Sequence, residues 1–119
     1  MRALRGATSV AANGAEEIVA ATRELLEELL ERNGATAEDL VSIVFTATPD
    51  LTAAFPAAGA RALGLADVPL LCASEIAVQG ATERVIRVLV HLYTGRSRHE
   101  LEHVYLHEAA GLRVDLAQP

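Results

Sequence analysis

Two charged residues, Glu75 and Arg87, stand beside apolar runs and are the first candidates for chemistry in this sequence. Glu75 follows the run at 68–72, and Arg87 lies inside a second run at 85–90. A guanidinium among such neighbours must be paired or must face a ligand, because burying a lone charge is prohibitively costly. The pattern therefore indicates a site in which a fixed positive charge meets an anion.

The element that positions Arg87 is ambiguous in the pattern. If residues 84–93 form a strand, Arg87 shares a face with Leu89, which is not a wetted face. If they form a helix, Arg84, Arg87 and His91 make one solvated stripe. The period slightly favours the helix, whereas the β-branched residues of the run favour the strand. Both alternatives stay open on the residues alone.

Charge and basic-residue type limit the possible partners. The net charge is −6, and all ten basic residues are arginines, which excludes lysine Schiff-base chemistry. Neither a basic patch nor interleaved aromatic residues are present, so we do not expect nucleic acid as a partner. An anion would be recognised by arginine, which stays charged and can bind a carboxylate through two hydrogen bonds.

Length and cysteine content limit the class of protein. The 119 residues suffice for one domain, which we expect to span residues 1–119. No apolar run is long enough to cross a bilayer, and Arg2 and Arg5 are not followed by the apolar segment of a secretory signal. The single cysteine, Cys72, excludes an internal disulfide and fits a reducing compartment. We therefore expect a cytoplasmic protein without a membrane partner.

Turn and capping signals divide the chain into alternating strands and helices, which predicts an α/β sheet layer covered by helices. The strand at 40–46 is expected to be buried on both faces or nearly so. The residues Thr36-Ala37-Glu38-Asp39 resemble a capping box with Asp in place of Glu. Besides the ambiguous segment, the expected elements are strands at 2–11, 40–46, 68–72 and around 104–106, a long helix between Asn13-Gly14 and Asn33-Gly34, and a short helix at 57–63.

The stretch 99–103 matches the H-E-x-x-H pattern of zinc proteases, but three features argue against a zinc site. The third ligand of the longer pattern would fall at Ala109. Too few residues follow His103 to supply a second ligand-bearing helix. The stretch also runs into residues 104–106, which favour a strand and would break the helical register of the two histidines. We expect a polar turn with solvated histidines and no bound metal.

The residues left without a structural explanation are four arginines near small residues or strands, together with one acid and one phenol. Gly6 beside Arg5 also suggests a close approach of the backbone to a neighbour. Cys72 could in principle be a nucleophile, but a lone cysteine at a strand end is more often a small buried hydrophobe. We expect this set to hold a small and multiply charged anion; its members are Arg5, Arg61, Arg87, Arg113, Glu75 and Tyr105.

At these residues the sequence resembles a known family, the monofunctional bacterial chorismate mutases of the trimeric pseudo-α/β-barrel type found in bacilli. The resemblance spans Arg5 to Leu116, and its motifs follow one another in the same order at similar spacing. They are Arg5-Gly6-Ala7-Thr8, Ala47-Thr48-Pro49-Asp50-Leu51, Phe55-Pro56-Ala57, Val68-Pro69 with Cys72 and Glu75, Ile86-Arg87-Val88, His103-Val104-Tyr105-Leu106, Leu112-Arg113 and Asp115-Leu116.

The resemblance implies a fold and a reaction. The implied fold is a mixed sheet of about five strands covered by one long and one short helix, with the sheets forming the core of a homotrimer. The stretch matching 84–92 is a strand in the family, so Arg87 would point into a site. The family converts chorismate to prephenate on the shikimate route to aromatic amino acids. This Claisen rearrangement needs no cofactor, because it depends on holding the substrate folded and stabilising the charge that grows on the ether oxygen.

The resemblance also implies a role for each candidate residue in a site shared by two subunits. The catalytic set would be Arg87, the cation at the ether oxygen, with Glu75 and Arg5. Arg5 and Tyr105 would hold the enolpyruvyl carboxylate, and Glu75 with the backbone of Cys72 would hold the ring hydroxyl. The remaining substrate-binding residues would be Phe55, Ala57 and Leu112 on the apolar wall, and Arg61 and Arg113 at the mouth.

Three departures from the family pattern leave an alternative open. Ala58 replaces a lysine, Leu71 replaces a threonine, and Val114 replaces a proline. A polar contact near Cys72 would be missing, so substrate binding would be weaker. The alternative is a non-catalytic trimeric module that binds a small anion on the same scaffold.

Overall fold

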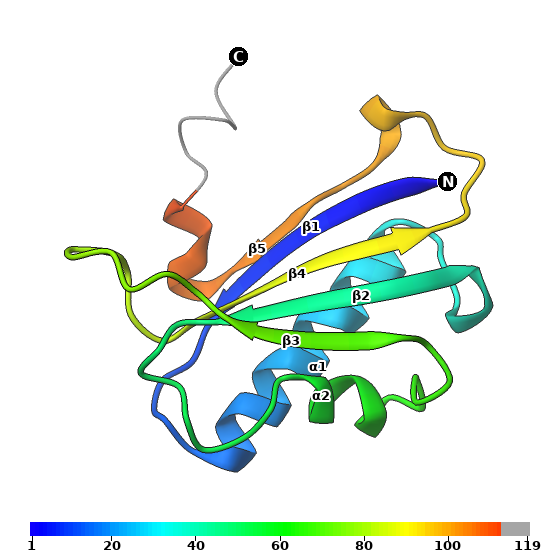
Figure 1. The fold of residues 1–119 in the computed structure, drawn as a ribbon. Helices are drawn as coiled ribbons and strands as arrows, with labels where there is room; N and C mark the ends of the chain where they lie inside the picture. The colour runs from blue at the N-terminus through cyan, green and yellow to red at the C-terminus, as the bar shows by residue number, and fades with distance from the viewer. Residues whose placement is uncertain (113–119) are drawn as a thin grey trace.

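The computed structural model describes residues 1–112 of the chain, and within them it contains one five-stranded mixed sheet. Both α-helices cover the same face of that sheet (Figure 1). The predicted fold class, a mixed sheet with one long and one short helix, is confirmed. The elements are β1 (Arg2–Ser9), α1 (Ala15–Arg32), β2 (Leu40–Ala47), α2 (Ala57–Ala62), β3 (Leu70–Ser74), β4 (Val85–Leu92) and β5 (Val104–Leu106), with 3₁₀ turns at Ala37–Asp39, Arg98–Glu100 and His107–Gly111.

Strand β4 lies at the centre of the sheet, whose order is β3-β2-β4-β1-β5. It pairs antiparallel with both β1 and β2, while β3 runs parallel to β2 and β5 runs parallel to β1. The segment that was ambiguous in the sequence is therefore a strand. Pairing on both sides satisfies its backbone hydrogen bonds, and its β-branched side chains suit a pleated surface.

The core lies between the sheet and α1. Leu25, Leu26 and Leu29 of the helix pack against Leu4 and other buried strand residues. Gly6 permits this packing, because a Cβ at that position would come within 2.9 Å of the Leu29 Cδ1 atom. The neighbour that Gly6 approaches is therefore the long helix.

One buried side chain ties the end of α1 to the segment that leads into β5. The amide nitrogen of Asn33 donates hydrogen bonds to the Leu29 carbonyl at 2.8 Å and to the Glu102 carbonyl at 2.9 Å. Its amide oxygen accepts a hydrogen bond from the Glu102 backbone N–H at 2.8 Å. Asn33 is only 3% exposed, and its two bonds to Glu102 hold the segment from which β5 begins.

Three strands differ in detail from the prediction. The strand β1 ends at Ser9, whereas the predicted strand extended to residue 11. The strand β3 lies two residues further along the chain than the predicted 68–72. The strand β2 is buried on one face only, with Phe45 buried and Thr46 half-exposed, because no helix covers the other face. The predicted capping box is confirmed, since the Asp39 carboxylate accepts a hydrogen bond from the Thr36 backbone N–H at 2.8 Å.

Of the helices in residues 1–112, none has both the length and the apolar character needed to span a bilayer.

Candidate active site

The face of the sheet that carries no helix, called the open face below, brings Arg87 beside residues from two other strands. In the β4 registers, Arg87 lies opposite Ala7 of β1 on one side and Thr46 of β2 on the other. Arg5 and Leu89 form the next pair on the same face, because side chains alternate along a strand. The period of two therefore gathers polar side chains on the open face while their chain neighbours are buried.

Glu75 supplies the partner that Arg87 was predicted to require. Its carboxylate accepts from the Arg87 Nε atom at 3.1 Å through Oε2 and at 3.3 Å through Oε1. The Thr46 hydroxyl donates to Oε2 at 2.6 Å, and the Glu75 backbone N–H donates to the Ala47 carbonyl at 2.9 Å. The Arg87 side chain remains 42% exposed and that of Glu75 19% exposed. The Arg87 guanidinium is therefore paired with a carboxylate and is still accessible from solvent.

A pocket of about 370 Å³ lies on this face beside Arg87 and Thr46, and we call it the open-face pocket. Tyr105 reaches it because β5 places this residue opposite Ala7, on the side of β1 away from Arg87. The backbone N–H of Arg5 donates to the His103 Nδ1 atom at 2.9 Å, which joins the two strands just before β5 begins. The residues that line the pocket are Arg5, Gly6, Ala7, Val44, Thr46, Arg87, Val88, Leu89 and Tyr105.

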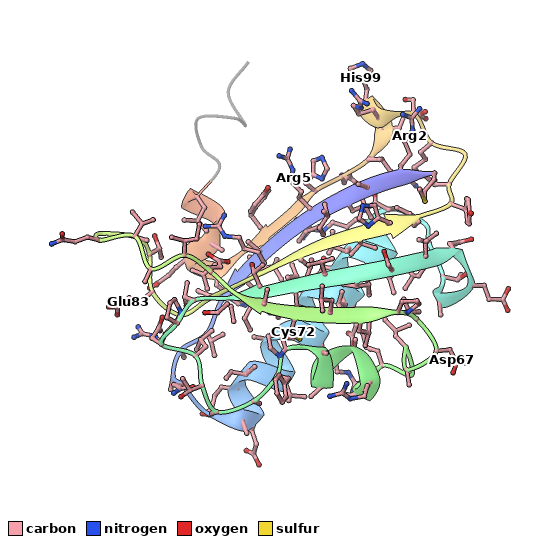
Figure 2. All side chains as sticks on the ribbon, viewed as in Figure 1. Arg2, Arg5, Asp67, Cys72, Glu83 and His99 are labelled. Atoms are coloured by element: carbon pink, nitrogen blue, oxygen red, sulfur yellow. The ribbon has the colours of Figure 1, made fainter. Side chains whose placement is uncertain are left out.

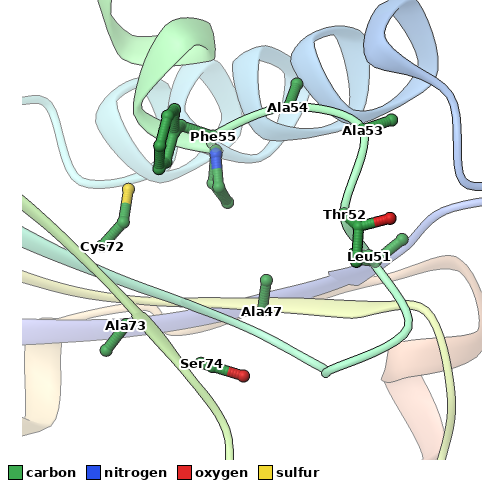
Figure 3. Close-up of a pocket in the computed structure, with 10 residues that line it drawn as sticks. Ala47, Leu51, Thr52, Ala53, Ala54, Phe55, Cys72, Ala73 and Ser74 are labelled. Carbon is green, nitrogen blue, oxygen red and sulfur yellow. The ribbon is translucent and has the colours of Figure 1, made fainter.

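A second pocket, of about 510 Å³, lies between β3 and the segment that precedes α2, and we call it the edge pocket. Figure 3 shows the Cys72 sulfur pointing toward the Phe55 ring at one side of this pocket. Cys72 pairs with the buried Phe45, so its side chain lies on the helix-covered side of the sheet. The lining residues are Ala47, Leu51, Thr52, Ala53, Ala54, Phe55, Pro56, Cys72, Ala73 and Ser74.

The predicted site residues thus fall into separate groups within one chain. Figure 2 shows Arg5 projecting away from the helices and Cys72 on the side of α2. Ala57 is buried at the start of α2, next to the edge pocket, and Arg61 is exposed on the same helix. Leu112, the last described residue, lines neither pocket. Arg113 lies outside the described residues, as does Val114.

The stretch that matches the zinc-protease pattern does not form one helix. Arg98–Glu100 is a 3₁₀ turn, and the chain is already extended at Leu101. The Glu100 carboxylate accepts a hydrogen bond from the Ser97 backbone N–H at 2.8 Å, and this bond lowers the pKa of the Glu100 carboxyl group. Glu100 is therefore a cap for the turn. Within residues 1–112, no three His, Cys, Asp or Glu side chains form a group that could hold a metal ion.

Thr46 belongs to the charged cluster, although the sequence patterns did not single it out. The available signal was a hydroxyl in the otherwise apolar second half of strand β2, but such a residue is common on half-exposed strands. Only the pairing of β2 with β4 places Thr46 beside Arg87.

Three kinds of comparison with known proteins agree on one family. The sequence matches the family Chorismate mutase type I over residues 1–116. It is 49% identical over 117 residues to the chorismate mutase AroH of Thermus thermophilus, covering 98% of this chain and 96% of that protein. It is 41% identical over 118 residues to the chorismate mutase AroH of Bacillus subtilis, with 98% and 93% covered. A solved chorismate mutase from Clostridium thermocellum superposes with a TM-score of 0.91 at 47% identity, covering 92% of this chain and 98% of that one.

Proposed function

This chain belongs to the chorismate mutase type I family, and from that premise we propose how its own residues convert chorismate to prephenate. In this rearrangement a C–O bond breaks while a C–C bond forms within one molecule, and negative charge grows on the ether oxygen. A site therefore has to fold the substrate and place a fixed cation at that oxygen. None of the comparisons supports the non-catalytic alternative.

The observation that carries the proposal is how the Arg87 guanidinium is held. Glu75 binds it through Nε, and among residues 1–112 no hydrogen bond engages its two terminal nitrogens. Those nitrogens are the donors that we assign to the breaking C–O bond and to a substrate carboxylate. Because arginine stays charged and the ion pair fixes its side chain, little reorganisation is needed during the reaction.

The other residues of the open-face pocket suit a dianionic substrate. Arg5 and Tyr105 line the pocket beside Arg87, and we assign them to the enolpyruvyl carboxylate. A guanidinium and a phenol can both donate to a carboxylate, and arginine can do so through two hydrogen bonds. We assign the ring hydroxyl of the substrate to Glu75 and to the backbone at Cys72.

We further propose that a complete site forms between two chains of a homotrimer. Within one chain the open-face pocket and the edge pocket lie on opposite sides of the sheet, so one substrate cannot contact both. Large apolar side chains at their margins are exposed, including Phe55 at 71% and Leu71 at 63%. Exposed apolar surface of this kind favours association. A neighbouring chain would then supply Phe55, Ala57 and the Cys72 backbone.

The remaining candidates are assigned to the mouth of the shared site. Arg61 is exposed on α2, the helix that begins next to the edge pocket, and there it would add positive potential that attracts a dianion. Arg113 is assigned the same role, and Leu112 is assigned to the apolar wall. The departures Ala58 and Leu71 would leave fewer polar contacts on this side and weaken substrate binding.

We also propose a setting for the protein. Residues 1–119 would act as one domain, and the protein would work in the reducing cytoplasm. The free thiol of Cys72 supports this compartment, because it would stay reduced there. The proposed trimer predicts a particle of three times the 12.6 kDa chain mass, measurable by light scattering.

The test of the proposed function is Arg87→Ala, assayed by the loss of chorismate absorbance. Removing one preorganised donor of this kind costs about 3–4 kcal/mol in the barrier, so we expect a fall in kcat of roughly a hundredfold or more. Arg23→Ala is the matched control, because it removes an equal charge from an exposed pair on α1. Wild-type turnover in a folded Arg87→Ala protein would refute the assigned role.

A further inference from the structure

The hydroxyl of Thr46 makes the shortest hydrogen bond in the charged cluster, and none of the roles assigned above uses it. Its oxygen lies 2.6 Å from the Glu75 Oε2 atom, a distance typical of a hydroxyl that donates to a carboxylate. We propose that Thr46 is a positioning residue of the reaction, which orients the Glu75 carboxylate and through it the Arg87 guanidinium. This inference rests on the proposed function, because it assumes that Glu75 and Arg87 act on the substrate.

The position of the Thr46 hydroxyl is set by the sheet and does not depend on Glu75. Thr46 lies in β2 directly opposite Arg87 of β4, and on its other side it pairs with Ala73 of β3. Threonine is branched at Cβ, so its side chain has few available rotamers. The hydroxyl is therefore held in a nearly constant position relative to the Arg87 backbone.

Glu75 has more freedom, which is why a second contact matters. Its backbone N–H donates to the Ala47 carbonyl at 2.9 Å, and this bond extends the β2–β3 pairing by one residue. Its side chain has three further torsions between that anchor and the carboxylate. Among residues 1–112, the Thr46 hydroxyl and the Arg87 Nε atom are the two groups that hold the carboxylate in place.

The two oxygens of the Glu75 carboxylate accept different numbers of hydrogen bonds. Oε2 accepts from the Thr46 hydroxyl and, at 3.1 Å, from Arg87 Nε, whereas Oε1 has only the longer contact of 3.3 Å with Nε. Oε1 therefore keeps the spare acceptor capacity. The structure assigns Oε1, and not Oε2, as the oxygen that accepts the ring hydroxyl of the substrate.

Removal of the hydroxyl would free the carboxylate to turn. A carboxylate next to a guanidinium favours a paired contact with two nitrogens, and such a contact would engage a terminal nitrogen of Arg87. That nitrogen would then be withdrawn from the substrate. The backbone hydrogen bonds of Thr46 and Glu75 would remain, so the fold would be kept. The effect would therefore be a slower chemical step.

The experiment compares Thr46→Val with Thr46→Ser in steady-state kinetics with chorismate. Valine has nearly the same shape without the donor, so we expect kcat to fall about tenfold, while serine keeps most of the wild-type rate. The pair Thr46→Ala and Thr46→Ser also differs in the hydroxyl alone and replaces the first comparison if the valine protein does not fold. Thermal melting of every variant separates turnover from stability.

A double-mutant cycle decides whether the hydroxyl acts through Glu75. In a Glu75→Ala background, Thr46→Val should cause no further loss, because there is no carboxylate to orient. An equal tenfold loss in both backgrounds would overturn the proposed route. If Thr46→Val keeps the wild-type kcat while Arg87→Ala is inactive, the role of Thr46 is refuted and the proposed function stands. An active Arg87→Ala would instead refute the proposed function on which the inference rests.

Discussion

The two faces of the sheet use the same strands and have opposite characters. On the helix-covered face, Leu4, Phe45 and Val88 are almost completely buried. On the open face, their neighbours Arg5 and Arg87 are polar and accessible to solvent. One residue along a strand is enough to pass from the core to the candidate site, because successive side chains point to opposite faces.

This difference separates the determinants of folding from those of the reaction. On the covered face, α1 and α2 bury one continuous apolar core within the single chain. On the open face, Arg87 is paired with Glu75 but remains accessible and lines a pocket. No element of residues 1–112 covers this face (Figure 1). We infer that substitutions in the buried core of the covered face act on stability, whereas substitutions on the open face and at the exposed rim of the edge pocket act on turnover and association.

The largest expected effect concerns the pairing of the two pockets across chains. Arg87→Ala disables the open-face pocket, and Phe55→Asp places a carboxylate in the edge pocket, where it repels a dianion. Each variant alone should be nearly inactive. Trimers assembled at random from equal amounts of both should regain about a quarter of the wild-type activity, because a working site needs one intact half from each of two chains.

Co-expression of the two variants with different affinity tags, followed by assay of the mixed trimers, measures this recovery. Phe55→Leu is the control for the edge pocket, since it keeps an apolar side chain at an exposed position. If the mixed protein is as inactive as its parents, the site lies within a single chain and the shared arrangement is wrong.

The next effect is on stability, from the covered face. Leu4→Ala removes a side chain that is 0% exposed and packed in the main core cluster. Such truncations leave a cavity and cost about 2–5 kcal/mol in the free energy of unfolding. Chemical denaturation followed by circular dichroism should show this loss at every protein concentration. A change below about 1 kcal/mol would mean that the core is not as closed as its burial indicates.

The smallest effect comes from the same substitution on the open face. Leu89 is 37% exposed within the chain, so Leu89→Ala should lower the stability of the subunit by less than about 1 kcal/mol. Its main consequence should be a weaker trimer, because the lost apolar surface would lie between chains. The trimer would then begin to dissociate at a higher protein concentration than the wild type. Sedimentation at several concentrations measures this shift. A loss as large as that of Leu4→Ala, independent of concentration, would contradict the distinction between the faces.

Much of the fold could be read from local patterns. The long helix was predicted between its two Asn-Gly signals because capping and apolar spacing are properties of neighbouring residues. The burial of β2 was predicted wrongly, since an apolar strand does not reveal whether one face or both are covered. The two-residue displacement of β3 has the same origin, because hydrogen bonds to β2 and not local preference decide where that strand begins.

The candidate site divides in the same way. The sequence by itself determined that Arg87 needs a partner or a ligand if its run is a strand, because a guanidinium buried alone is too costly, but the pattern left a solvated helix equally open. The sequence pattern also singled out Glu75, but the geometry of its contact with Arg87 through Nε depends on β3 and β4 both pairing with β2. Only the tertiary structure brought Thr46 beside them and set Phe55 on the far side of the sheet. These relations join residues distant in the chain, and hydrogen bonding between strands, which local sequence does not encode, decides them.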